Sequence, residues 1–395
     1  MRRLYFKRIF ALLTAVLLAL GGIMIQPVNA NAAGTRIIKE IRVTGSYTEV
    51  TAGKVLTSSA TYSDRYFYGK ATAENVKLAK LSMLASAATY DREYALALME
   101  SLKFVGRTYK QVPVTKTDND HVSYAIGHKT INGFEVIAVW IRGTGMDYEW
   151  VSNFNMGTGK THAGFSAAEA ELWKSVNAYI RRKNLSDAKL KFWITGHSRG
   201  AAVGNLFAKR MTDRYGSSKV YAYTFATPRV STAAKKTGYS NIRNYLNSGD
   251  YITELPPKEW NYKRYGTDIT FRNASKNAMK AAFKEKTGIS YGGFTKAEKE
   301  ALAAAVLKYA GEHVRNYYAK NDWGESPSDF FQNGLGYMLA NDEEGMMKVL
   351  MIAYSTPEAA EVYKKLSFQA DGGIKFVHAH CLTGYITWLD AMYPD

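Results

Sequence analysis

A short apolar strand, a glycine-flanked turn and an alanine-rich helix follow one another directly in residues 190–214, and this order restricts the fold more than any other feature. LKFWIT (190–195) has the length and composition of a strand buried on both faces of a sheet. Residues 199–214 have helical spacing, and Gly216 follows them as a typical helix stop. A strand that leads directly into a helix predicts an α/β fold with a mainly parallel central sheet.

Other segments repeat this alternation along the chain. Further strands are predicted at residues 121–128, 134–142, 219–227 and 241–247, and further helices at residues 73–88, 92–103 and 166–182. Asn132-Gly133, between the first two strands, is a strong hairpin signal. Asp91 can cap the second helix, and Ser166 with Glu169 forms a capping box for the third. Strands that alternate with helices predict helices on both faces of the sheet.

From about residue 272 the sequence changes to helices only. The first of these helices ends at Gly288 and carries on one face the lysines Lys276, Lys280 and Lys284. Further helix starts are predicted at Thr295, Ser326 and Thr356. IKFVHAH (374–380) is then interpreted as a last strand, followed by a closing helix. The sequence predicts an α/β catalytic domain of residues 33–271 and 369–395, with an all-helical insert, suited to form a cap or lid, at residues 272–368.

The first 32 residues have the pattern of a secretory signal peptide. Four basic residues precede an uncharged run that extends to Ile25, and cleavage sites of the A-x-A type follow at Ala30 and Ala32. An uncleaved membrane anchor is the alternative, which a glycine pair and Pro27 disfavour. We expect the protein to be secreted.

The chain is basic, with a formal net charge of +17. Loss of the signal peptide removes its four basic residues and no acidic residue, which lowers this charge by four to +13. The basic residues are mixed with acidic ones, and no nucleic-acid-binding motif is present, so we expect either affinity for an anionic membrane or cell-wall surface or simply a contribution to solubility. The single cysteine, Cys381, excludes a disulfide within the chain and favours a bacterial export route over a eukaryotic one.

The turn after the buried strand reads G-H-S-R-G and places Ser198 between two glycines. The pattern G-x-S-x-G is weak by itself, because Ser290 stands in a second copy that no strand precedes. A nucleophile elbow needs a strand on one side and a helix on the other, since the strained turn exposes the hydroxyl, and only the Ser198 copy has both. The helix N-terminus also favours negative charge that develops there. We predict that Ser198 is a nucleophile; a plain tight turn is the alternative.

A serine nucleophile needs a histidine base, and in this kind of fold the base follows both the serine and an acid. Three histidines satisfy this order: His313, His378 and His380. His313 lies on an apolar helical stripe, which is typical of packing. His378 and His380 both stand at the end of the predicted last strand and remain alternatives at this point.

The orienting acid should follow a strand that comes after the nucleophile. Asp250 is the first carboxylate after the strand predicted at 241–247 and its Ser248-Gly249 turn. Glu254 is the nearest competitor, but a proline two residues later indicates that the chain is already leaving the sheet there. We predict that Asp250 is the acid.

Several motifs in this order resemble the class 3 lipase family, the fungal-type lipases of the α/β-hydrolase fold, here in a secreted bacterial form. The resemblance covers roughly residues 73–266 and 374–393. The motifs are IRGT (141–144), HAGF (162–165), ITGHSRG (194–200), TFATPRV (224–230), NSGDYITELPP (247–257) and AHCLTGY (379–385).

The resemblance implies a catalytic triad of Ser198, Asp250 and His380. It favours His380 over His378 because the family places its histidine a few residues before a tyrosine, here Tyr385. It also implies that the backbone amides of Thr144 and Arg199 form the oxyanion hole. Arg199 replaces the leucine that is usual after the nucleophile, but this change leaves the amide in place.

Together these features predict a secreted serine hydrolase that cleaves carboxylic esters, in particular lipid acyl esters as in lipases or phospholipases A1. The predicted chemistry requires neither a metal nor an organic cofactor. Two alternatives remain: a non-lipid esterase that acts on cell-wall or polysaccharide esters, and a catalytically silent surface-binding protein on a hydrolase scaffold.

Overall fold

The structure is a computed structural model that describes residues 40–292, 295–297 and 375–394, apart from residues 50, 51, 114–119, 146–148, 155, 156, 158 and 257–260. The predicted signal peptide and most of the predicted insert lie outside the described residues, as do His313 and the helix starts at Ser326 and Thr356. Within the described ranges, no helix is long and apolar enough to cross a membrane.

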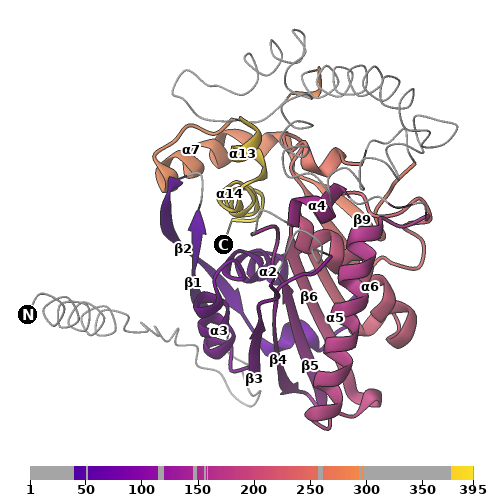
Figure 1. The fold of residues 1–395 in the computed structure, drawn as a ribbon. Coiled ribbons are helices and arrows are strands. Elements are labelled where there is room, and N and C mark those ends of the chain that lie inside the picture. Colours follow the sequence, from indigo (N-terminus) through magenta and orange to yellow (C-terminus); the bar gives the residue numbers. More distant parts are fainter. Residues whose placement is uncertain are drawn as a thin grey trace, which may run out of the picture.

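A seven-stranded sheet forms the centre of the molecule (Figure 1). In spatial order its strands are β3 (Val105–Lys110), β4 (Tyr124–Ile131), β5 (Phe134–Ile141), β6 (Leu190–His197), β7 (Val220–Phe225), β8 (Ile242–Leu246) and β9 (Thr267–Thr270). The first three are antiparallel, whereas β5 to β9 run parallel. The predicted hairpin turn is present, because Asn132 and Gly133 both have positive φ, 50° and 75°. The parallel pairing of β5 to β9 confirms the predicted, mainly parallel sheet.

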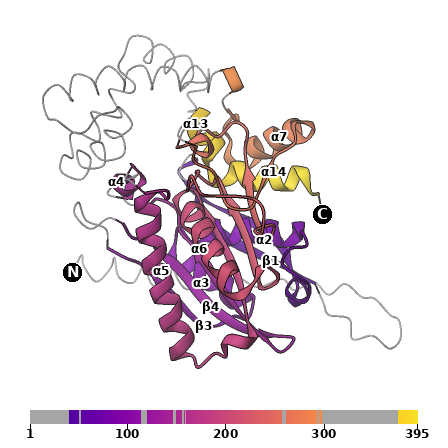
Figure 2. The same ribbon diagram turned by 90° about the vertical axis from the view of Figure 1, so that its right-hand side faces the viewer.

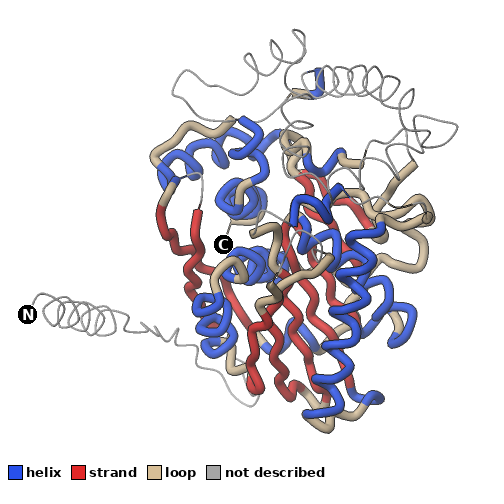
Figure 3. The backbone as a smooth tube through the Cα atoms, viewed as in Figure 1, coloured by secondary structure: helices blue, strands red, loops and turns tan. Residues whose placement is uncertain are grey.

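Helices cover both faces of this sheet, as Figures 2 and 3 show. The helices on one face are α5 (Ala163–Arg182) and α6 (Arg199–Tyr215), and those on the other are α2 (Val76–Ala88), α3 (Arg92–Ser101) and α14 (Leu382–Met392). Along β5, Val136, Ala138 and Trp140 join the core beneath α2, whereas the residues between them join the core beneath α5 and α6. Helical layers on both sides of a mainly parallel sheet confirm the predicted α/β-hydrolase fold.

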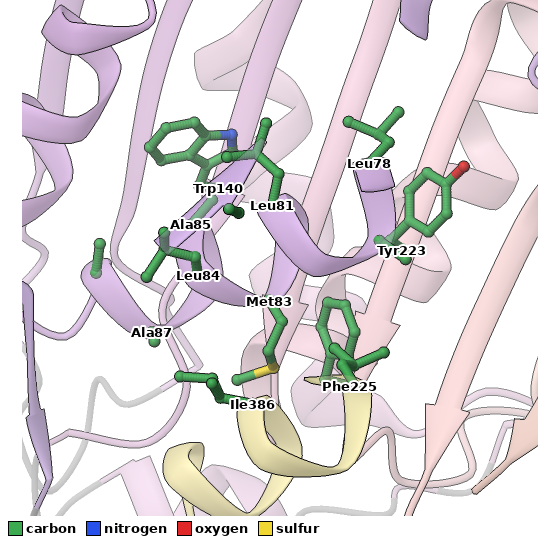
Figure 4. Close-up of a cluster of buried hydrophobic side chains, with 14 of the residues drawn as sticks. Leu78, Leu81, Met83, Leu84, Ala85, Ala87, Trp140, Tyr223, Phe225 and Ile386 are labelled. Atoms are coloured by element: carbon green, nitrogen blue, oxygen red, sulfur yellow. The ribbon is translucent and has the colours of Figure 1, made fainter. Parts of the chain in front are cut away.

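Helix α2 packs between the sheet and the C-terminal helix α14. Almost all of its residues are buried, and Figure 4 shows Leu81 beside Trp140 of β5 and Met83 between Phe225 of β7 and Ile386 of α14. Each such side chain contributes about 1.5–3 kcal/mol when it leaves water. Two polar bonds join α2 to β6 below this core: Trp193 Nε1 donates to Ser82 Oγ at 2.8 Å, and Ser86 Oγ lies 2.7 Å from Thr195 Oγ1. β6, which leads into Ser198, and α14 are therefore held against the same helix.

An N-terminal β-hairpin, β1 (Ile41–Glu49) and β2 (Lys54–Tyr62), forms a separate two-stranded sheet that packs on α2. This hairpin and the edge strands β3 and β9 were not predicted from the sequence. β9 has only four residues, and the pairing of β3 with β4 shifts register between Val105 and Thr108. Such short or irregular edges leave little periodicity in the sequence.

Two predicted elements are wrong. IKFVHAH forms no strand: residues Lys375–His380 are a short helix, α13, and the edge of the sheet beyond β8 is occupied by β9. Helix α5 begins at Ala163, three residues before Ser166, because His162 accepts the N–H of Phe165 as the N-cap. Glu169 lies nearly two turns inside that helix and pairs with Arg210 through two hydrogen bonds of 2.6 Å.

Helix α7 (Lys276–Thr287) ends as predicted at Gly288, whose φ of 78° is left-handed. Met279 and Phe283 are buried in the same core cluster as α14, and the three lysines of the predicted stripe are exposed on the other side of the helix. The first helix of the predicted insert is therefore packed against the C-terminal helix.

Candidate active site

Ser198 occupies the turn between β6 and α6. Its backbone conformation is one that residues other than glycine rarely adopt. Its φ is 57° and its ψ is −127°, at a cost of about 1–3 kcal/mol. The surrounding backbone fixes this geometry, because Ser198 N–H donates to Phe225 O of β7 at 3.0 Å, and Ser198 O accepts from Ala201 and Ala202. The predicted strand–turn–helix arrangement around Ser198 is confirmed.

The flanking glycines are required by how closely the backbone approaches itself. A Cβ atom on Gly196 would lie 2.4 Å from Gly200 O, and one on Gly200 would lie 2.4 Å from Ile141 O. Any side chain at either position would therefore push the helix away from the strand and change the place of Ser198.

The structure brings Ser198, His380 and Asp250 into one hydrogen-bonded chain. His380 Nε2 lies 2.8 Å from Ser198 Oγ, and His380 Nδ1 lies 2.9 Å from Asp250 Oδ2. The carboxylate of Asp250 is fully buried and accepts further bonds from Tyr385 Oη at 2.7 Å and Ile252 N at 3.0 Å. Because a carboxylate only accepts, Nδ1 carries the proton, and Nε2 is left to accept from the serine hydroxyl.

The turn that carries Asp250 is tied directly to the segment that carries His380. Asn247 Nδ2 donates to Ala379 O at 2.8 Å, and Asn247 N donates to Tyr385 Oη at 3.1 Å. Tyr385 therefore accepts from one side of this turn and donates to Asp250 on the other. These bonds align two segments 130 residues apart in sequence.

The competing residues lie elsewhere. His378 is buried with its ring 5.5 Å from that of Phe283, away from the chain of bonds at Ser198. Glu254 forms an ion pair with Arg229. Cys381, next to His380, caps α14: its Sγ accepts from Gly384 N at 3.3 Å.

His197 holds the backbone of His380, a partner that the sequence did not indicate. Its Nε2 lies 2.8 Å from His380 O and its Nδ1 lies 2.9 Å from Tyr90 Oη. Burial lowers the pKa of His197 well below its ordinary value, so the ring is neutral. Nε2–H therefore donates to the carbonyl, and Nδ1 accepts from the tyrosine hydroxyl. From the sequence, a histidine directly before the serine is expected to make local hydrogen bonds beside the turn, and hydrogen-bond partners of this kind are present.

The two residues predicted for the oxyanion hole flank the elbow. Thr144 follows β5 in a loop that lies against the elbow, since a Cβ atom on Gly143 would come within 2.7 Å of His197 O. The ion pair of Arg142 with Glu149 at 3.0 Å fixes this loop from inside the protein. Arg199 is the first residue of α6, where backbone N–H groups have no partner within the helix.

Asn153 connects the side chains of both residues and was not foreseen. It lies on α4 (Glu149–Phe154), donates through Nδ2 to Thr144 Oγ1 at 3.0 Å, and accepts from Arg199 Nη1 at 3.1 Å. The Arg199 guanidinium also donates to His121 O at 2.9 Å, and its burial lowers the pKa to about 10. The arginine side chain is thus a structural link behind the site. In the described part of the chain, no cluster of His, Cys, Asp and Glu is suited to hold a metal ion.

Part of the chain is similar to known proteins. Residues 130–260 match the family described as lipase (class 3). This match to the class 3 lipase family covers 131 of the 395 residues, about a third of the chain. The matched residues include Thr144, Ser198, Arg199 and Asp250, whereas His380 lies beyond them.

Two curated proteins that are similar to part of this chain are fungal. The secreted mono- and diacylglycerol lipase 1 of Fusarium solani is 28% identical over 149 residues, which cover 34% of this chain and 43% of that protein. The secreted mono- and diacylglycerol lipase MDL3 of Malassezia globosa is 27% identical over 109 residues, which cover 26% and 36%. The chain thus spans less than half the length of these relatives. A solved structure of mono- and diacylglycerol lipase from Aspergillus oryzae is 19% identical, with 51% of this chain and 81% of that chain covered and a TM-score of 0.39.

Proposed function

We propose that this protein is a serine hydrolase that cleaves carboxylic esters of lipids. The observation that carries the proposal is the hydrogen-bonded chain from Ser198 through His380 to the buried Asp250, on a strained turn at the start of a helix. The similarity of residues 130–260 to the class 3 lipase family supports the same chemistry.

In the first half of the reaction, Ser198 Oγ attacks the ester carbonyl while His380 Nε2 accepts its proton. Asp250 keeps the proton on Nδ1 and stabilises the imidazolium that forms. The carbonyl oxygen becomes an oxyanion, which accepts from the amides of Thr144 and Arg199. When the intermediate collapses, His380 donates its proton to the leaving alcohol, and the acyl group stays on Ser198.

In the second half, water attacks the acyl-enzyme and gives a proton to His380 Nε2. A second tetrahedral intermediate forms and collapses, the carboxylic acid leaves, and Ser198 recovers its proton from His380. Nucleophile, base, orienting acid and oxyanion donors are all groups of this chain, so the scheme is complete without a cofactor.

Lipid acyl esters are the proposed substrates because both curated relatives are named as mono- and diacylglycerol lipases. Both relatives are also named as secreted. We propose export of this chain with cleavage after Ala30 or Ala32, which N-terminal sequencing of the exported protein tests.

We further propose that the exposed lysines of α7 contact an anionic lipid surface, because Lys276, Lys280 and Lys284 lie together on the solvent side of that helix.

Hydrolysis of p-nitrophenyl esters of increasing acyl length tests the function. Ser198→Ala should lower kcat at least about 10³-fold. Ser290→Ala is the matched control, because Ser290 occupies the second G-x-S-x-G, and it should keep full activity. Rates that rise towards long acyl chains support a lipid substrate. Activity on acetyl esters alone would contradict it, and equal loss in both variants would remove Ser198 from the mechanism.

A further inference from the structure

A buried carboxylate from the N-terminal hairpin contacts the helix that follows His380. Glu49 is the last residue of β1 and is 2% exposed. Its Oε2 accepts from Thr383 N at 2.8 Å and from Thr383 Oγ1 at 2.6 Å, and Tyr47 Oη of the same strand lies 3.0 Å from that hydroxyl. In Figure 1 the hairpin lies beside α14. Strand and helix meet although more than 330 residues separate them in sequence.

The contact falls at the end of α14 where a carboxylate binds best. Thr383 is the second residue of α14, and the first N–H groups of a helix have no partner within it. A negative charge there also interacts favourably with the helix dipole. The other cap is the Cys381 thiol, a weak acceptor 3.3 Å from Gly384 N. Glu49 therefore supplies the stronger of the two constraints on where α14 begins.

The start of α14 determines where His380 can stand. Only Cys381 and Leu382, both buried, separate His380 from Thr383. At Cys381 the backbone is extended, with φ −67° and ψ 160°, and this single residue joins α13 to α14. A shift of the first turn of α14 would thus pass directly to His380. Asp250 and His197 hold the ring and the carbonyl of His380, and Tyr385 ties α14 to Asp250 and Asn247. Glu49 holds α14 closer to His380, at Thr383.

We infer that Glu49 is a positioning residue for His380, and that the β1–β2 hairpin is part of the catalytic machinery. This inference rests on the proposed function of His380. Glu49 touches no reacting atom; it fixes the turn between α13 and α14 so that His380 Nε2 stays within reach of Ser198 Oγ.

Kinetics of Glu49→Ala and Glu49→Gln test the inference. Alanine removes both bonds to Thr383, and kcat for a p-nitrophenyl ester should fall by about 10- to 100-fold, with KM nearly unchanged, because a small displacement of a catalytic group is costly. Glutamine retains an amide oxygen that can accept both bonds, so most of kcat should return. Thr383→Val removes the hydroxyl but keeps the backbone N–H that donates to Glu49, so its loss of kcat should be intermediate. This variant replaces Glu49→Ala in the test if Glu49→Ala does not fold.

Asn75→Ala is the matched control, because Asn75 Oδ1 caps α2 at Leu78 N, at the end of that helix remote from the site. It should lower Tm like the Glu49 variants but leave kcat intact. If Glu49→Ala keeps the wild-type kcat while Tm falls, Glu49 only stabilises the fold and the inference is wrong. If the wild type shows no Ser198-dependent hydrolysis, the proposed function fails first, and the role of Glu49 fails with it.

Discussion

Two buried histidines support the site as neutral hydrogen-bonding groups. His162 stacks on Phe165 with ring centroids 3.8 Å apart, and its Nε2 lies 3.0 Å from Asn153 O. Burial lowers the pKa of His162 to about 3 and that of His197 well below its ordinary value. Each ring can therefore donate to a carbonyl from Nε2 and accept at Nδ1 across the neutral pH range. His380, by contrast, faces a carboxylate on one side and a hydroxyl on the other.

The low pKa of His162 predicts that stability depends on pH. Below the unfolded pKa of about 6.5, the unfolded chain binds a proton that the folded protein does not, so the contribution of His162 is complete above that pH. It is lost as the pH falls from 6.5 towards 3, by up to about 1.4 kcal/mol per pH unit.

His162→Asn keeps a short side chain suited to cap a helix and removes this titration. Between pH 7 and pH 5 the wild type should lose about 1–2 kcal/mol more unfolding free energy than the variant. Urea unfolding at both pH values measures the difference. An equal loss in both proteins would show that His162 is not the group that titrates.

At the scale of elements, the sequence predicted what is encoded locally. The strand–turn–helix around Ser198 and the Asn132-Gly133 hairpin depend on neighbouring residues, and both are present. IKFVHAH was misread because a run of seven residues, six of them apolar or histidine, fits either a strand or a helix. The place beside β8 is taken by β9. The start of α5 was misplaced because His162 caps it, a residue outside the usual set of helix caps.

The exposed lysines of α7 give a prediction at this scale. Replacement of Lys276, Lys280 and Lys284 by Gln should weaken binding to vesicles that contain phosphatidylglycerol by about 100-fold, since each lysine contributes roughly 1 kcal/mol near an anionic surface. The control replaces Lys183, Lys235 and Lys236, which are exposed away from α7 and carry the same total charge. Sedimentation with vesicles measures both variants. An equal loss in both would mean that net charge, and not α7, determines binding.

At the scale of the whole molecule, the site is assembled from segments far apart in sequence. The elbow carries Ser198, the turn after β8 carries Asp250, and the last two helices carry His380 and Tyr385. Ser198 and Asp250 could be named from the order of elements, because each follows a strand of the sheet. Residue patterns alone did not separate His380 from His378; the family resemblance favoured one, and only the fold shows which ring faces Ser198.

The contacts that support these groups could not be predicted from the sequence. Tyr90 with His197, Asn153 with Arg199, and Glu49 with Thr383 each join elements through tertiary packing. No local periodicity marks such pairs. Their positions follow from how α2, α4 and the N-terminal hairpin pack around the sheet.

Labelling by a fluorophosphonate probe, followed by mass spectrometry of the labelled peptide, tests whether His380 activates Ser198, because the probe reacts only with an activated serine. The wild type should carry the label on Ser198, His380→Ala should label at least about 10³-fold more slowly, and His378→Ala should label at the wild-type rate. A label on another residue, or the same rate for His380→Ala as for the wild type, would contradict the assignment of His380 as the base that activates Ser198.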